Sequence, residues 1–168
     1  MAPVELQYMN KAYLLIGGNM GNRLQNLGRS VQLLQQYGEI VKLSDHYETA
    51  AWGKTDQPAF LNQALLLHTP LSARALLQTI LQIEEQLGRK REEKYGPRII
   101  DMDILFFNND IIDEPGLKVP HPEIPNRRFV LAPMQEIAGS LVHPILGKTI
   151  ATLLLETNDT LEVRKLHG

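Results

Sequence analysis

The sequence predicts an α+β fold, in which helices pack on one face of an antiparallel sheet. Two segments, 24–38 and 72–88, carry apolar residues at helical spacing and end at glycine. Short apolar runs bounded by turn residues stand before, between and after them, as is typical of strands. The resulting order is βαββαβ, and a chain of 168 residues is long enough to bury one core.

A sharp turn separates the first strand from the first helix. Residues 12–16 form an apolar run, and the segment 17–22, rich in glycine and asparagine, breaks it and supplies a helix cap. The following helix has an apolar stripe at spacings of 3, 4 and 3, made of Leu24, Leu27, Val31 and Leu34. We expect this stripe to be buried and the helix to end near Gly38.

Two strands and a second helix come next. Residues 40–47 form one strand and residues 61–68 form its partner, because each run is apolar and bounded by turn residues. The second helix starts at Ser72, presents leucine and isoleucine along one side, and ends at Gly88.

The last strand of the core is the most informative segment, because it places Asp101 and Asp103 on one face. A period of two sends the apolar residues to the opposite face, namely Ile100, Met102, Ile104 and Phe106. Aspartate is depleted in strands, and two neighbouring carboxylates repel each other. A hard divalent cation such as Mg²⁺ would remove that repulsion and bind substrate phosphates. The pair therefore predicts a metal-dependent phosphate site.

A basic segment precedes this strand. It holds five of the 17 lysines and arginines, namely Arg89, Lys90, Arg91, Lys94 and Arg98. Guanidinium groups bind phosphate oxygens in bidentate fashion and so complement a carboxylate pair that holds metal. Together the two features favour phosphoryl transfer over the alternative of a solvated loop beside an exposed sheet face.

The βαββαβ order resembles the ferredoxin-like split βαβ arrangement, in which the second sheet face stays available. After the core, a proline-rich connection at 115–125 is expected near the site. Helical patterns at 129–138 and 149–156 and a short strand at 161–163 predict a C-terminal helical elaboration. No linker or repeat interrupts the chain, so residues 1–168 are expected to form a single domain.

Composition argues against several kinds of site and partner. Cysteine is absent, which removes disulfides, thiol nucleophiles and thiolate metal sites. The five histidines lack the short spacings of a zinc site. A net charge of −2 argues against coating nucleic acid or an anionic membrane, and no apolar run reaches the length of a spanning helix. We expect a cytoplasmic protein with no nucleic-acid or membrane partner.

Four sequence blocks, in order, resemble a known enzyme family. They are Asp56-Gln57-Pro58-x-Phe60-Leu61-Asn62, Gly88-Arg89-x-Arg91, Gly96-Pro97-Arg98-x-x-Asp101-x-Asp103-Ile104, and Val119-Pro120-His121-Pro122 with Asn126-Arg127-x-Phe129 after it. They are similar to those of the 6-hydroxymethyl-7,8-dihydropterin pyrophosphokinases of folate biosynthesis. The match spans most of the chain, and the Gly-Pro-Arg-x-x-Asp-x-Asp block is highly characteristic of that family.

The resemblance implies transfer of a pyrophosphoryl group from ATP to the hydroxymethyl oxygen of 6-hydroxymethyl-7,8-dihydropterin, with release of AMP. It implies that Asp101 and Asp103 hold two Mg²⁺ ions that neutralise phosphate charge and orient the alcohol. It also implies that Arg89, Arg91 and Arg98 act in catalysis by handling the phosphates, the first two from a loop that closes over the nucleotide.

The same resemblance implies the binding residues of both substrates. Besides the three arginines, nucleotide contacts fall at Glu84, Ile104, His121 and Arg127. Pterin contacts fall at Thr49, Ala50, Trp52, Asn62, Asp101 and the two ring-stacking aromatics, Phe60 and Phe129. A flat heteroaromatic ring gains from stacking on aromatic faces, and an asparagine offers both a donor and an acceptor to its amide-like edge.

Two other interpretations use part of this set. A metal-dependent nucleotide hydrolase would use the aspartates and arginines with water as acceptor, but it gives no reason for Phe60, Asn62 and Phe129. A non-enzymatic RNA-binding module of ferredoxin-like fold presents stacking aromatics within its strands, whereas this chain places Asp101 and Asp103 there. Only the pyrophosphokinase is expected to bind both a dihydropterin and a Mg²⁺-nucleotide.

Overall fold

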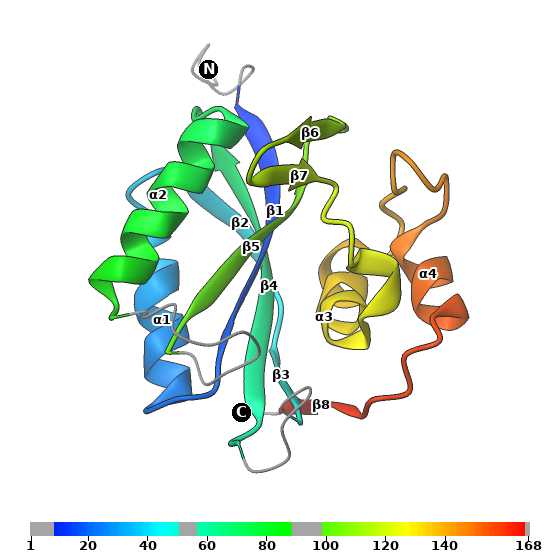
Figure 1. Cartoon of the computed structure of the whole chain (residues 1–168), viewed down its shortest axis with the longest axis horizontal. Coiled ribbons are helices and arrows are strands. Elements are labelled where there is room, and N and C mark those ends of the chain that lie inside the picture. The colour runs from blue at the N-terminus through cyan, green and yellow to red at the C-terminus, as the bar shows by residue number, and fades with distance from the viewer. Residues whose placement is uncertain (1–8, 51–56, 89–98, 167–168) are drawn as a thin grey trace.

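The computed structural model describes residues 9–50, 57–88 and 99–166, which form a six-stranded sheet with helices on both faces (Figure 1). The strands of this sheet are β1 (Asn10–Gly18), β2 (Glu39–Leu43), β3 (His46–Thr49), β4 (Phe60–Thr69), β5 (Asp101–Phe107) and β8 (Val163–Leu166). Their order is β5-β1-β4-β3-β8, with β2 also paired to β4, and every pair is antiparallel. The predicted α+β class and ferredoxin-like core are confirmed.

Two helices cover one face of the sheet, α1 (Arg23–Leu34) and α2 (Ala73–Gln86) (Figure 1). Their first turns are capped by the side chains of Asn22 and Ser72, which accept hydrogen bonds from backbone N–H groups three residues ahead. In the predicted stripe of α1, Leu27 and Leu34 are buried and Val31 is partly buried, but Leu24 in the first turn is 55% exposed. Alternate residues of β1, β4 and β5 fill the core beneath these helices.

The second face of the sheet is only partly available, because α3 (Arg128–Ala138) and α4 (Ile150–Glu156) pack on it (Figure 1). A separate apolar cluster joins them to the sheet and includes Leu15, Leu105 and Met134. The end of this face near Gly17 stays uncovered by helix and lines a cavity. The prediction that the whole face stays available was therefore too broad.

The strand expected over residues 40–47 is divided into β2 and β3. Ser44 lies between them, and its hydroxyl accepts a hydrogen bond from the backbone N–H of Ala64 at 3.0 Å. This side-chain bond takes the place of a ladder bond, so the strand is interrupted there. β2 is left at the margin of the sheet with Val41 and Leu43 exposed.

A register shift changes the expected facing of β5. Tyr13 pairs with Phe106 while Leu14 pairs with Ile104, so Leu105 is an extra residue on the β5 side. The bulge sends Phe106 into the cluster under α3 and α4. The prediction that Phe106 shares a face with Ile104 was wrong for this reason.

The proline-rich connection contains more regular structure than expected. A hairpin of β6 (Ile112–Glu114) and β7 (Leu117–Val119) turns at Gly116, whose φ of +75° favours glycine. A 3-10 turn, η2 (Ile124–Asn126), follows. The N–H of His121 donates to the carbonyl of Leu105 at 2.9 Å, which fixes this connection against β5. Within the described ranges, no helix combines the length and apolar character required to cross a membrane.

Candidate active site

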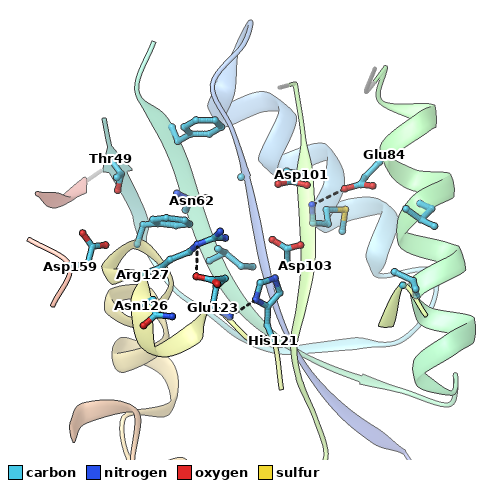
Figure 2. A pocket seen from close by; sticks show the side chains of 18 of the residues that line it. Thr49, Asn62, Glu84, Asp101, Asp103, His121, Glu123, Asn126, Arg127 and Asp159 are labelled. Atoms are coloured by element: carbon cyan, nitrogen blue, oxygen red, sulfur yellow. Dashed lines mark hydrogen bonds and ion pairs between the residues drawn. The ribbon is translucent and has the colours of Figure 1, made fainter. Parts of the chain in front are cut away.

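A cavity of about 1040 Å³ lies over the uncovered end of the sheet, between α2, the β6–β7 hairpin and the start of α3 (Figure 2). This volume is at the upper end for a small-molecule site, so the cavity has room for two molecules side by side. Ten residues expected from the sequence line it, namely Thr49, Ala50, Phe60, Asn62, Glu84, Asp101, Asp103, His121, Arg127 and Phe129. Residues far apart in the sequence therefore converge on one site.

Of the five remaining expected site residues, only Ile104 lies in the described part of the chain. Ile104 is 6% exposed and packs in the core beneath α1 and α2, outside the cavity lining. Its proposed contact with nucleotide stays a prediction. The other four, Trp52, Arg89, Arg91 and Arg98, lie outside the described residues.

Paired residues on three adjacent strands form a row across the sheet, with a polar side chain at each end. Gly17 of β1 pairs directly with Asn62 of β4 on one side and with Asp101 of β5 on the other. Directly paired residues of antiparallel strands point to the same side of a sheet. Asp103 lies two residues further along β5 and shares that side. The row thus brings a buried amide and two carboxylates to one wall of the cavity.

Glu84 of α2 fixes the backbone between the two aspartates. Its Oε2 accepts a hydrogen bond from the N–H of Met102 at 2.8 Å (Figure 2). The residue is only 2% exposed. β5 lies at the edge of the sheet, so this N–H needs a partner beyond the ladder. The carboxylate of Glu84 therefore holds the aspartate-bearing strand against α2 and is not a solvated helix residue.

The imidazole of His121 is held in one tautomer. Its Nδ1 accepts a hydrogen bond from the N–H of Glu123 at 3.1 Å, so in the neutral ring the proton is on Nε2 (Figure 2). Burial lowers the pKa of His121 below its usual 6.5, and Arg127 lowers it further against the opposing influence of Glu123 and Asp101. At neutral pH the ring is therefore an uncharged donor through Nε2.

Arg127 places a cation at the same end of the cavity. Its Nε lies 3.8 Å from a carboxylate oxygen of Glu123, and its guanidinium carbon is 5.7 Å from the centre of the Phe129 ring. Contact with both an acid and an aromatic face restricts the guanidinium. Phe129 and Phe60 are each partly exposed and line the cavity, so they are available for contact with a ligand.

Thr49 contributes a hydroxyl that the described protein atoms leave unsatisfied. The residue is 3% exposed and lines the cavity, and its Oγ1 has no hydrogen-bond partner within the described part of the chain. Buried hydroxyls are normally paired, since an unpaired one carries a desolvation cost. The observation favours a polar ligand at this point of the wall.

Arg23 braces the two strands that carry this wall. Its Nη1 donates to Oε2 of Glu48 at 2.7 Å and to the carbonyl of Ala59 at 2.9 Å. Those acceptors immediately precede Thr49 on β3 and Phe60 on β4. Hydrogen bonds from Arg23 chiefly, and from a second arginine, hold the pKa of Glu48 below its usual value. The first residue of α1 thus fixes the spacing of two lining residues.

Sequence reasoning missed several lining residues, among them Gly17, Glu123, Asn126 and Asp159. Glu123 and Asn126 stand beside His121 and Arg127 in the chain, so their position was a usable signal. Asp159 had no such signal in the sequence, because tertiary packing brings it to the cavity from the segment after α4. Its Oδ2 accepts a hydrogen bond at 2.9 Å from the N–H that opens α3, and its negative charge suits a helix N-terminus.

The described part of the lining is acidic. It contains two arginines, Arg74 and Arg127, against five carboxylates, namely Glu84, Asp101, Asp103, Glu123 and Asp159. Arg74 is already paired with Glu114 at 2.7 Å. An acidic wall repels a polyanion, so it can bind one only if cations lie between the wall and the ligand.

The donor set at Asp101 and Asp103 suits Mg²⁺ better than zinc. Two carboxylates on one face supply hard oxygen ligands, and Mg²⁺ usually completes its shell with water and substrate phosphate. Among the described residues there is no cluster of three or more metal-binding side chains. Two carboxylates leave places in an octahedral Mg²⁺ shell for water and phosphate oxygens.

Comparison with known proteins identifies relatives of the chain. Residues 13–139 match the family model described as 7,8-dihydro-6-hydroxymethylpterin-pyrophosphokinase (HPPK). A 2-amino-4-hydroxy-6-hydroxymethyldihydropteridine pyrophosphokinase of Aquifex aeolicus is 39% identical over 84% of this chain and 89% of that protein. The Bacillus subtilis protein of the same name is 45% identical over 76% of this chain and 78% of that protein.

A solved structure agrees in fold. A Plasmodium falciparum HPPK-DHPS triple mutant superposes with a TM-score of 0.73 at 19% identity, over 88% of this chain. The match covers 43% of that longer chain, so it concerns less than half of the Plasmodium protein.

Proposed function

The chain belongs to the 7,8-dihydro-6-hydroxymethylpterin-pyrophosphokinase family, and from this premise we propose that it transfers pyrophosphate from ATP to 6-hydroxymethyl-7,8-dihydropterin in folate biosynthesis. The products are AMP and the pterin pyrophosphate. The row formed by Asn62, Gly17 and Asp101 is the observation that carries the proposal. It sets an amide able to read a pterin edge beside carboxylates able to hold Mg²⁺.

The pterin occupies the side of the cavity near β3 and β4. Phe60 and Phe129 present aromatic surface to a flat ring, and the carboxamide of Asn62 pairs with its donor and acceptor edge. The pterin gives the buried hydroxyl of Thr49 the hydrogen-bond partner that the described protein atoms do not supply. Ala50 and Trp52 complete the list of proposed contacts, the latter outside the described residues.

ATP occupies the side near α2 and the β6–β7 hairpin. Leu77 and Leu81 of α2 give that end an apolar surface suited to a nucleobase. The Nε2–H of His121 donates to a phosphate oxygen, and the guanidinium of Arg127 offsets phosphate charge. Arg89, Arg91 and Arg98 are proposed to supply the remaining positive charge.

Asp101 and Asp103 hold the metal, which we propose to be two Mg²⁺ ions. When bound, Mg²⁺ neutralises the charge of the phosphates and favours their in-line orientation. Asp101 also lies next to the proposed pterin position, so it orients the hydroxymethyl group toward the phosphates. Glu84 keeps both carboxylates in place through the N–H of Met102.

The reaction needs no covalent enzyme intermediate. The hydroxymethyl oxygen bonds to the β-phosphorus of ATP, the bond from that phosphorus to the α,β-bridging oxygen breaks, and AMP leaves with that oxygen. The hydroxyl proton is released. Phosphoryl transfer relies mainly on positioning and electrostatic stabilisation, and the residues above supply both.

The direct test is incubation of the protein with ATP, Mg²⁺ and 6-hydroxymethyl-7,8-dihydropterin, followed by chromatography of both products. AMP and pterin pyrophosphate in equal amounts are expected. AMP without modified pterin would instead identify a nucleotide hydrolase. Omission of Mg²⁺ is expected to abolish the reaction.

We also propose that residues 1–168 act as one pyrophosphokinase domain in the cytoplasm. The helices of both layers pack on a single sheet, which supports one domain. The absence of cysteine is compatible with a reducing compartment.

A further inference from the structure

Gly17 stands at the centre of the row that carries the proposed function, yet it has no assigned role. It lies near the end of β1, the strand between β4 and β5, and it lines the cavity. Glycine weakens a strand because it has no side chain to pack, so its place here calls for a reason. Its φ is not in the left-handed region that favours glycine, so backbone conformation does not supply one.

The space above Gly17 is taken by Asn62. A Cβ built on Gly17 would overlap Oδ1 of Asn62 and stand 3.1 Å from its Cγ. It would also stand 3.0 Å from the backbone carbonyl oxygen of Leu61, so β4 would have to give by a few tenths of an ångström. The carboxamide of Asn62 therefore lies across β1 only because residue 17 has no side chain.

The position of this amide has a consequence for the substrate. Two strand spacings, about 10 Å, separate the backbones at Asn62 and Asp101. A two-ring heterocycle with a one-carbon substituent can lie across this interval. A side chain at position 17 would fill space between Asn62 and Asp101. It would also displace the amide of Asn62 from the row.

We propose that Gly17 is a positioning residue for pterin binding. It lets Asn62 read the pterin edge from a position level with β1, so that the hydroxymethyl group is directed toward Asp101. This inference rests on the proposed function, because it assumes that Asn62 binds the pterin. Gly17 contributes because it has no side chain, and it acts through Asn62.

A double-mutant cycle tests this inference. Gly17→Ala, Asn62→Ala and the double variant are compared with the unmodified protein by the KM for dihydropterin, the KM for ATP and kcat. Gly17→Ala is expected to raise the dihydropterin KM roughly tenfold, the loss of about one to two amide hydrogen bonds, with the ATP KM within about twofold. In the Asn62→Ala background the same substitution is expected to add less than about twofold, since the displaced amide is gone.

Gly28→Ala is the matched control. Gly28 lies on the exposed side of α1, and a Cβ there meets nothing within 4 Å. This change is expected to leave all three kinetic constants unchanged and to raise Tm slightly, because alanine favours helix. It shows what an added methyl does away from the site.

A second measurement does not depend on activity. In a ¹H–¹⁵N NMR spectrum, the side-chain NH₂ signals of Asn62 are expected to shift in Gly17→Ala and to stay unchanged in Gly28→Ala. An unchanged dihydropterin KM in Gly17→Ala, an equal loss in the Asn62→Ala background, or unshifted Asn62 signals would each overturn the inference. Failure of the proposed function is a different result, in which the unmodified protein forms no pterin pyrophosphate.

Discussion

Replacing Thr49 by valine is expected to stabilise the protein and to weaken dihydropterin binding. The hydroxyl of Thr49 is buried, and none of the described residues gives it a hydrogen bond. Valine has nearly the same shape and favours strands, so Thr49→Val removes the unpaired polar atom without opening a cavity. One change therefore separates the requirements of folding from those of binding.

The expected sizes follow from the cost of an unpaired buried group. Desolvating such a group costs about 1–3 kcal/mol, and recovering the lower part of this range adds about 1 kcal/mol to the free energy of unfolding. For a chain of 168 residues that is a rise of about 2–4 °C in Tm. Loss of one hydrogen bond to the ligand, about 0.5–1.5 kcal/mol, raises the Kd for dihydropterin roughly 2- to 13-fold.

Thermal unfolding followed by circular dichroism and calorimetric titration with dihydropterin measure the two effects. Thr49→Ser is the control, because it keeps the hydroxyl and loses one methyl group. It is expected to lower Tm and to bind dihydropterin as the unmodified protein does. A lower Tm for Thr49→Val, or an unchanged dihydropterin affinity, would refute the reasoning.

Three further perturbations test other parts of the site. Asp103→Asn is expected to reduce turnover by roughly 100-fold or more, because it removes a metal ligand. Turnover near that of the unmodified enzyme would contradict the metal assignment. Arg23→Met is expected to raise the dihydropterin KM about fivefold, the equivalent of about 1 kcal/mol, with little change in kcat. Arg164→Met is its control, since Arg164 donates to the same carboxylate, that of Glu48, at 2.6 Å but lies on β8. Equal effects of the two changes on the dihydropterin KM would exclude the role of Arg23 in bracing β3 and β4. Burial lowers the pKa of His143 below 6.5, so folding keeps this group neutral and stability is expected to fall as pH drops through 6.5 toward the folded-state pKa. His143→Gln is expected to flatten that dependence in urea denaturation between about pH 7 and 5, and an unchanged slope would show that other groups cause it.

The sequence alone predicted the site residues that are unusual for the element in which they lie. Asp101 and Asp103 were conspicuous because carboxylates are unusual in a strand, and the strand period placed them on one face without knowledge of their neighbours. The family motifs then indicated Asn62, and also Phe60 and Phe129, which without the motifs would have been assigned to packing. Each of these five residues lines the cavity.

What the sequence did not predict depends on three-dimensional packing. The facing of Phe106 depends on a bulge that a strict alternation cannot anticipate. The resemblance placed Glu84 near the nucleotide, but no local pattern indicated that its carboxylate accepts a hydrogen bond from the N–H of Met102 at the edge of β5. The role proposed for Gly17 depends on the side chain of Asn62, which lies above it. In each case the deciding partner is distant in the sequence.

The hydrogen bond from the start of α3 to Asp159 has a practical consequence for how the protein can be shortened. The family model matches residues 13–139, but Asp159 and the β8 strand that pairs with β3 lie beyond that range. A chain trimmed at the matched boundary would keep Arg127 and Phe129 while losing the carboxylate that anchors their helix. During synthesis, likewise, a ribosome must release residue 159 before this wall can be completed. The range matched by the family model and the range needed to complete this wall of the cavity therefore end at different positions in the chain.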